Sequence, residues 1–178
     1  MRVLGLDPGS RRTGFGVVER HGSRLSCVEH GCVRPPAGAA LALRLHHIAR
    51  EIDVVLRRTA PDAVAIEEAF FRENVRSALV LGHVRGALLV AAVERGCEVV
   101  EYSPREIKLS VTGNGGAAKE QVAAMVRRLL ALAATPSADA ADALAGAICH
   151  LNRTTFDRPR TLTPAAKRLA ALLAGASR

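Results

Sequence analysis

Several features that mark common protein classes are scarce in this sequence. The four cysteines contain no Cys-x-x-Cys pair and are too few for a disulfide framework, so we expect reduced, mostly buried thiols. No segment approaches the run of about 20 uncharged apolar residues that a membrane span requires. The first ten residues, MRVLGLDPGS, lack the apolar core of a signal peptide, and Asp7 falls where that core would lie. These absences predict a cytoplasmic protein with no membrane partner.

Aromatic residues and lysine are also rare, whereas arginine is abundant. The chain has four Phe, one Tyr and no Trp, and only three of its 25 basic residues are lysines. The formal net charge of +8 suits a polyanionic partner such as nucleic acid, although a basic surface also aids solubility. Residues 153–178 hold six basic residues and one acid, so most of the excess charge lies in this tail.

The apolar pattern predicts a single α/β domain. A chain of 178 residues with 49% hydrophobic content can bury one substantial core. Three strands separated by short polar turns indicate an antiparallel meander, and two later strands arrive through helical crossovers, which makes them parallel. We therefore expect a five-stranded mixed sheet flanked by helices. The expected strands are Val3–Leu6, Gly14–Val18, Leu25–Val33, Ala63–Ile66 and 97–103, and the expected helices are Leu41–Arg58, Val75–Arg95, one that begins at Pro104 after a Ser103 N-cap, Ala118–Leu132 and Ala138–Asn152.

Four carboxylates stand at the ends of these predicted elements. Asp7 closes the first strand and Glu67 the fourth, so both emerge at one end of the sheet if the strands are neighbours. Asp139 and Asp142 are three residues apart at the start of the last helix and share a face of it. Converging carboxylates repel one another unless a hard cation such as Mg²⁺ or Mn²⁺ lies between them, and two such ions can activate water for phosphodiester cleavage. The alternatives are structural, because Asp before Pro-Gly often forms a turn and acids at a helix start are favoured by the helix dipole.

A glycine-rich stretch, VTGNGGAAKEQV, precedes the fourth predicted helix. Gly113, Gly115 and Gly116 lie just ahead of Lys119, and Lys108 precedes the loop. Such a loop can bring backbone N–H groups and an ammonium against a phosphate, although it lacks the Gly-Lys-Ser/Thr of a P-loop. A flexible surface loop is the alternative interpretation.

Two adjacent aromatic residues, Phe70 and Phe71, follow Glu67 in the polar stretch EEAFFRENVRS. One ring can fill the core while the other is exposed, and the sequence leaves open which is which. An exposed ring beside a nuclease centre can stack on a base that has left its helix.

Five stretches together resemble the RuvC family of bacterial Holliday-junction resolvases. They are GLDPGSRRTGFGVV, AIEEAFF, SALVLGHVRGALLVAA, VEYSPREIKLSVTGNGGAAKEQV and ADAADALAGAICH, and they follow one another in order over residues 1–152. The resemblance implies an RNase H-like fold, a homodimer, and paired metal-dependent cuts near the crossover of four-way junction DNA. It also implies RuvA and RuvB, the branch-migration proteins, as partners.

The resemblance assigns roles to individual residues where the motifs match. It implies Asp7, Glu67, Asp139 and Asp142 as catalytic acids and ligands of Mg²⁺, for which Mn²⁺ can substitute, with two ions in each active site. It implies DNA contacts from Phe70, Phe71, Lys108, Gly115 and Lys119, with Phe70 as the wedge that stacks on a base. Glu68 stands beside Glu67, and both strand alternation and the family pattern favour Glu67.

The resemblance also divides the chain and suggests how it associates. We expect a nuclease domain over residues 1–153 and a basic tail over 154–178, in which Thr163 and Pro164 can begin a short helix. The helix Val75–Arg95 is apolar over more of its circumference than one sheet face requires, and Gly82 and Gly86 would let a second backbone approach. Ordinary packing on the sheet is the alternative, but a two-fold junction favours a two-fold dimer.

Three other functions are compatible with parts of the sequence. YqgF-type nucleases share the Asp-Pro-Gly opening and the fold but act on RNA, and the apolar helix and aromatic loop argue against them. Sugar-kinase and actin-like ATPases need two such lobes, whereas this chain has the length for one. A junction-binding protein without catalysis is disfavoured by the four carboxylates.

Overall fold

The structure, a computed structural model, describes residues 1–68 and 75–156. The predicted order of elements is confirmed. Three ends differ from expectation by three or more residues: β2 continues past Val18, α5 continues past Asn152, and α4 ends at Leu129 instead of Leu132. The short helix expected in the tail lies outside the described residues. The elements are β1 (Arg2–Asp7), β2 (Thr13–His21), β3 (Arg24–Val33), α1 (Leu41–Thr59), β4 (Ala63–Glu67), α2 (Val75–Glu94), β5 (Glu98–Tyr102), α3 (Pro104–Thr112), α4 (Lys119–Leu129) and α5 (Ala138–Phe156).

The five strands form one mixed sheet in the order β3-β2-β1-β4-β5. β1 and β2 pair antiparallel, as do β2 and β3, whereas β4 runs parallel to both β1 and β5. The expected three antiparallel strands followed by two parallel strands are therefore confirmed. Leu6 of β1 lies opposite Ile66 of β4, so the residues that follow them, Asp7 and Glu67, leave the sheet side by side.

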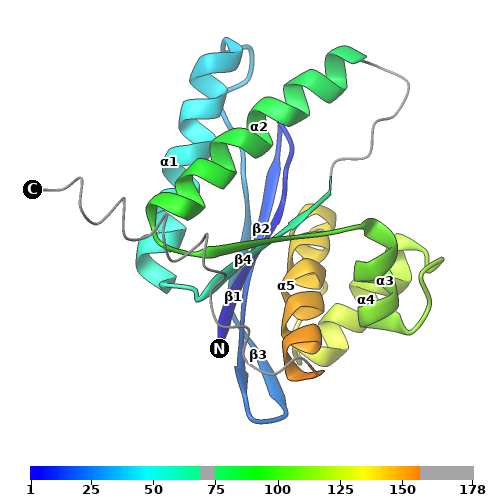
Figure 1. Ribbon diagram of the computed structural model, residues 1–178. Helices are drawn as coiled ribbons and strands as arrows, with labels where there is room; N and C mark the ends of the chain where they lie inside the picture. The colour runs from blue at the N-terminus through cyan, green and yellow to red at the C-terminus, as the bar shows by residue number, and fades with distance from the viewer. Residues whose placement is uncertain (69–74, 157–178) are drawn as a thin grey trace, which may run out of the picture.

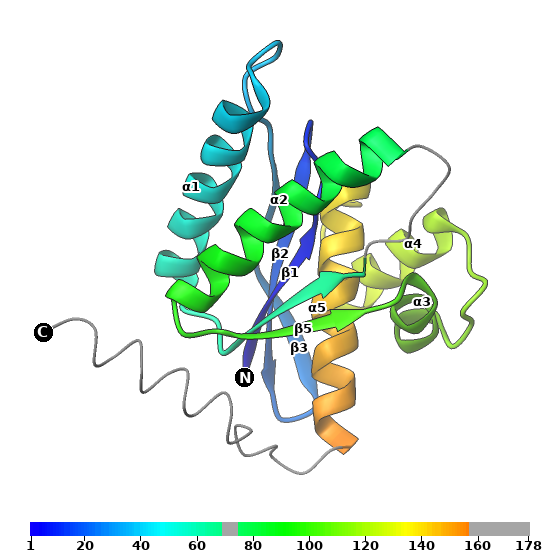
Figure 2. The same cartoon turned by 45° about the horizontal axis from the view of Figure 1, so that its top comes forward.

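Helices cover both faces of the sheet. α1 and α2 lie on one face, and α3, α4 and α5 lie on the other (Figure 1). Alternation along β1 serves both cores, because Leu4 and Leu6 pack toward α1 and α2 whereas Val3 packs toward α5. Figure 2 shows α5 running along the sheet on the side opposite α2. The first turns of α5 thus reach the end of the sheet where Asp7 and Glu67 emerge.

Glycines in the central strands let α5 approach the sheet closely. A Cβ atom on Gly5 would lie only 1.8 Å from the carbonyl oxygen of Ala143, and one on Gly14 would lie 2.0 Å from that of Asp139. Real Cβ atoms do not tolerate such distances, so these strand positions require glycine. The close approach fixes the height of α5 above the ends of β1 and β4.

α2 is more apolar than the packing of one helix face requires. Among the described helices it is the one long and apolar enough to cross a membrane by length and composition, and 28% of its most apolar window is buried. Core helices of globular proteins satisfy the same criterion. α2 packs against α1 and β5, and its Arg85 is buried and pairs with Glu101 of β5, which ties the helix to the sheet.

Candidate active site

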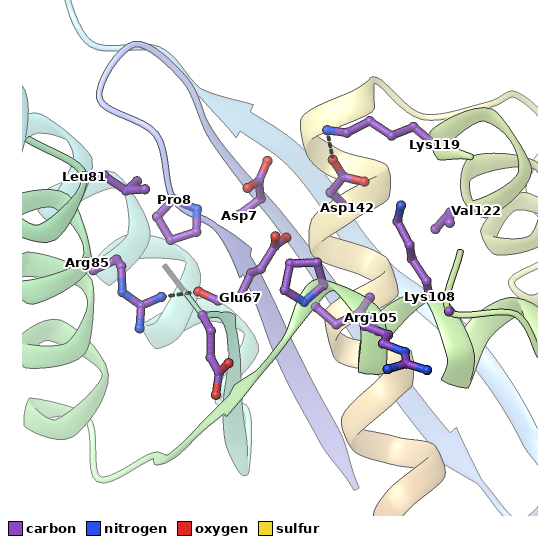
Figure 3. Close-up of a pocket in the computed structure, with 14 residues that line it drawn as sticks. Asp7, Pro8, Glu67, Leu81, Arg85, Arg105, Lys108, Lys119, Val122 and Asp142 are labelled. Carbon is purple, nitrogen blue, oxygen red and sulfur yellow. Dashed lines mark hydrogen bonds and ion pairs between the residues drawn. The ribbon is translucent and has the colours of Figure 1, made fainter. Parts of the chain in front are cut away.

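Asp7 and Glu67 stand together in a cavity at the end of the sheet. Both side chains are half-buried and line a cavity of about 690 Å³ (Figure 3). Parallel pairing of β1 with β4 places them there, because each is the last residue of its strand. Glu68 lines the same cavity but is exposed, and its backbone N–H donates to the Tyr102 carbonyl at 2.9 Å.

Asp142 reaches this cavity from α5, whereas Asp139 does not line it. Asp142 Oδ2 accepts a hydrogen bond from Lys119 Nζ at 3.1 Å. Asp139 lies one turn earlier and faces the edge of the antiparallel half of the sheet, where Cys32 Sγ donates to its Oδ2 at 3.7 Å. The two acids share a helix face as predicted but have different neighbours. The structure therefore brings three of the four predicted acids around one cavity and places the fourth beside it.

The acids are close enough to disturb one another's ionisation. Burial, together with the negative charges of Asp142, Glu67 and Asp139, raises the pKa of Asp7 to about 7, against the opposing effect of Lys119. Burial and Asp142 also raise the pKa of Glu67. The Asp142 carboxylate in turn raises the pKa of Lys119. Lys119, Lys108 and Arg85 oppose the rise in the pKa of Glu67 without cancelling it.

The donor set fits a hard divalent cation. Carboxylate oxygens are the ligands that Mg²⁺ and Mn²⁺ prefer, and the raised pKa of Asp7 shows that added positive charge would be favourable there. Within residues 1–68 and 75–156, no three His, Cys, Asp or Glu side chains already converge on one point. Mutual repulsion and the pairing of Lys119 with Asp142 account for this separation.

The two predicted lysines lie on the wall opposite the strand ends. Lys108 of α3, Lys119 at the start of α4 and Gly115 between them all line the cavity (Figure 3). The glycine loop is held by local hydrogen bonds, including one from the Gly116 N–H to Asn114 Oδ1 at 2.9 Å. Gly113 ends α3 with a φ of 75°, in the left-handed region that favours glycine. The glycine loop, held by its own hydrogen bonds, therefore forms one wall of the cavity.

Arg85 is a functional residue that the sequence reading missed. Its buried guanidinium donates to the backbone carbonyl of Glu67 and pairs with Glu101 Oε1 at 2.9 Å. It therefore ties the end of β4, from which Glu67 projects, to β5 and α2 (Figure 3). The available signal was a charged residue in the middle of a largely apolar helix.

The two predicted aromatic contacts are not placed by the structure. Phe70 and Phe71 lie within 69–74, outside the described residues. Their assignment as DNA contacts remains a prediction.

Comparison with known proteins identifies what this arrangement resembles. The family model for the crossover junction endodeoxyribonuclease RuvC matches residues 3–150. The curated RuvC of Bordetella avium is 53% identical over 150 residues, which is 84% of this chain and 83% of that protein. The RuvC of Trichlorobacter lovleyi is 50% identical over 152 residues, 85% of each chain. The solved structure of Thermus thermophilus RuvC in complex with Holliday junction substrate matches with a TM-score of 0.83 and 38% identity, covering 88% of this chain and 96% of that one. The sheet order and this likeness confirm the expected RNase H-like fold.

Proposed function

This chain belongs to the RuvC family of crossover junction endodeoxyribonucleases, and from that premise we propose that its acidic cavity hydrolyses backbone phosphodiesters in Holliday-junction DNA. The chain is a nuclease and a Holliday-junction resolvase that acts in DNA recombination and repair. One observation carries the assignment of the chemistry to this cavity: Asp7, Glu67 and Asp142 surround it, and Lys108 and Lys119 lie opposite them.

The family uses a divalent metal, and the finer assignment is our proposal. Asp7, Glu67 and Asp142 would hold Mg²⁺ or Mn²⁺, with Asp139 completing the set and two ions in each site. When bound, such ions activate a water and stabilise the leaving oxygen. The chain's own lysines supply positive charge for the phosphate, because Lys119 stands at the N-terminus of α4 and Lys108 faces the same space.

We further propose a homodimer formed through the outer face of α2. Val75 is 74% exposed, Leu79 61% and Val90 58%, which is unusual for large apolar side chains on one helix. Gly82 and Gly86 also face away from the other described residues, since a Cβ atom on either would meet none of them within 4 Å. Packing of these glycines on the sheet was the alternative to a dimer contact, and they do not pack there. The exposed stripe, at spacings of three and four residues, comprises Val75, Leu79, Gly82, Gly86, Val90 and Val93.

Several associated assignments rest on family membership and remain proposals. They are a cytoplasmic location, RuvA and RuvB as partners, a nuclease domain over residues 1–153 with a basic tail after it, and base stacking by Phe70. Binding of junction DNA follows from the family itself. The YqgF-like alternative, a nuclease that acts on RNA, is not favoured.

The test is cleavage of a synthetic four-way junction with Mg²⁺, beside a linear duplex of the same sequence and an RNA substrate. We expect paired nicks near the crossover of the junction, with the duplex and the RNA spared. Asp7→Asn should abolish cutting yet keep or improve junction binding, because a repulsive charge facing phosphate is removed. Preferential cleavage of RNA, or equal cleavage of the linear duplex, would contradict the proposal.

A further inference from the structure

A second cavity lies beside the acidic cavity and is lined by arginines. It has a volume of about 410 Å³. Arg11 comes from the turn after β1, Arg44 from the start of α1 and Arg76 from the start of α2. The remaining residues of its lining are Ser10, Ser77, Val80 and Leu81.

The positive charge of this pocket is not balanced by carboxylates within residues 1–68 and 75–156. In the described part of the chain, none of Arg11, Arg44 and Arg76 forms an ion pair with a carboxylate. The described residues that line the pocket include no acid, and neither α1 nor α2 has an acid in its first turn. The N-termini of both helices add partial positive charge. The pocket therefore favours an anion.

Arg44 is held in position for such a ligand. Its Nη1 donates to the Ser10 carbonyl at 3.4 Å, and its Nε is buried without a hydrogen-bond partner. A buried polar group without a partner is costly unless a ligand supplies one. The planar guanidinium matches the oxygens of a phosphate in two-point hydrogen bonding.

The pocket adjoins the acidic cavity at the turn that follows Asp7. Pro8 lines the acidic cavity, Ser10 lines the arginine pocket, and Leu81 lines both. A nucleic acid whose cut phosphate lies at the carboxylates therefore passes close to the arginines. Because the cut phosphate itself faces Lys108 and Lys119, the arginines must meet a different one.

We propose that this pocket, formed by Arg11, Arg44 and Arg76, binds one backbone phosphate of the junction DNA other than the phosphate that is cut. This inference rests on the proposed function, and it adds a contact on the α1 and α2 side of the cavity to the lysine contacts opposite. The ligand is a phosphodiester in DNA, and the pocket reads no base.

The experiment measures junction binding across a range of salt, in EDTA so that a metal-dependent nuclease leaves its substrate intact. The variants are Arg44→Gln and the pair Arg11→Gln with Arg44→Gln. Arg24→Gln is the matched control, because Arg24 is an exposed arginine at the start of β3, at the opposite end of the sheet from Asp7. Losing one phosphate contact should reduce the slope of log affinity against log salt by about 0.9 for the double variant. Arg44→Lys, which keeps the charge, should restore most of the slope.

A scan of the DNA locates the contact. Single phosphates around the crossover are replaced by uncharged methylphosphonates, and affinity is measured for wild type and for the double variant. At one phosphate that is not cut, replacement by methylphosphonate should weaken wild-type binding several-fold and leave binding by the double variant unchanged. Equal weakening in both proteins, or unchanged salt slopes in a variant that melts like wild type, would overturn the pocket assignment. Wild-type cleavage of the junction is scored separately, so its failure would count against the proposed function and not against the pocket.

Discussion

α2 and α5 are apolar helices of nearly equal length on opposite faces of one sheet, yet they are buried to very different extents. The residues of α5 from Ala140 to Leu151 are almost all buried, except Asp142. α2 instead leaves Val75, Leu79 and Val90 in contact with solvent. An apolar helix sequence is therefore compatible with two arrangements. The helix can be buried in the core on all sides, or it can pack on the core with one face and bind a partner with the other.

The difference follows from what covers each helix. α5 lies over the central strands, where Gly5 and Gly14 admit it, and α3 and α4 pack on its remaining side. α2 lies toward the β5 edge of the sheet beside α1, and no described element covers its outer face. Apolar surface of that extent on a helix indicates a partner.

The largest expected effect comes from the point where α5 leaves the core and enters the acidic cavity. Asp142→Asn removes a charge from the proposed metal ligands and should lower junction cleavage by about a hundredfold to a thousandfold, the size of effect seen when one charge-stabilising group is lost. Binding should persist, since the DNA contacts remain. Single-turnover cleavage and gel-shift titration measure the two, with Glu94→Gln at the end of α2 as the control acid. Loss of binding in step with cleavage would show that Asp142 acts in folding.

The next largest effect is the difference in stability loss between a buried leucine of α5 and an exposed leucine of α2. Leu144 of α5 is fully buried, so Leu144→Ala should lower the free energy of unfolding by about 2–5 kcal/mol. Leu79 of α2 is 61% exposed, so Leu79→Ala should change subunit stability by less than about 0.5 kcal/mol. Urea denaturation at concentrations where the protein is monomeric tests the pair. Equal losses would mean that the outer face of α2 is covered within one subunit.

A third prediction concerns what meets the exposed face of α2. Gly86→Glu places a bulky charge in the apolar stripe and should weaken dimerisation at least about tenfold, because an unpaired charge would be buried in the interface. The matched control is Leu109→Glu on α3, which is also an exposed apolar position. Sedimentation gives the oligomeric state, and the monomeric variant should resolve junctions poorly. A wild-type protein that sediments as a monomer while it makes paired cuts would exclude this dimer.

The smallest expected effect is on stability, and it comes from Glu106 and its partner Arg153 near the C-terminal end of α5. Hydrogen bonds from Ser103 and then from Arg153 of α5 lower the pKa of Glu106 to about 2, from its ordinary value of 4.5. A lowered folded-state pKa contributes stability above about pH 4.5, and that stability is lost as the pH falls toward 2. Because the Glu106 side chain is 43% exposed, the contribution is small. Glu106→Gln should therefore lower the urea midpoint slightly at neutral pH, where the contribution is fully present, and flatten its pH dependence between about pH 4.5 and 2.

Much of the fold could be predicted because its signals are local. The Asp-Pro-Gly turn ends β1 as expected, and Ser103 and Glu106 form the predicted capping box at the start of α3. The ends of elements were harder to predict where tertiary contacts extend them. Arg20 continues β2 beyond the apolar run because it pairs with Leu25 of β3, and Arg153 continues α5 past its expected end because it pairs with Glu106 of α3.

The site was predictable only as far as strand ends and helix spacing determine it. Helical spacing puts Asp139 and Asp142 on one face, but the height of α5 on the sheet decides which of them reaches the cavity, and no spacing rule gives that height. Arg11, Arg44 and Arg76 are separated by about thirty residues each along the chain and meet only in the folded state. The position of α5 and the meeting of the three arginines both depend on long-range packing, which cannot be read from a single sequence.

The contact between β1 and α5 also has a consequence for how the enzyme is made. β1 and α5 are the first and last described elements, and the central contact of the fold, Gly5 against Ala143, joins them. Contacts between such distant parts of a chain form late, because the intervening loop must first be closed. On the ribosome, the sheet stays uncovered on that face until α5 has emerged, and the carboxylates cannot assemble earlier. A nascent chain that stalls before α5 therefore has an incomplete core, and its acids come together only after α5 has been synthesised.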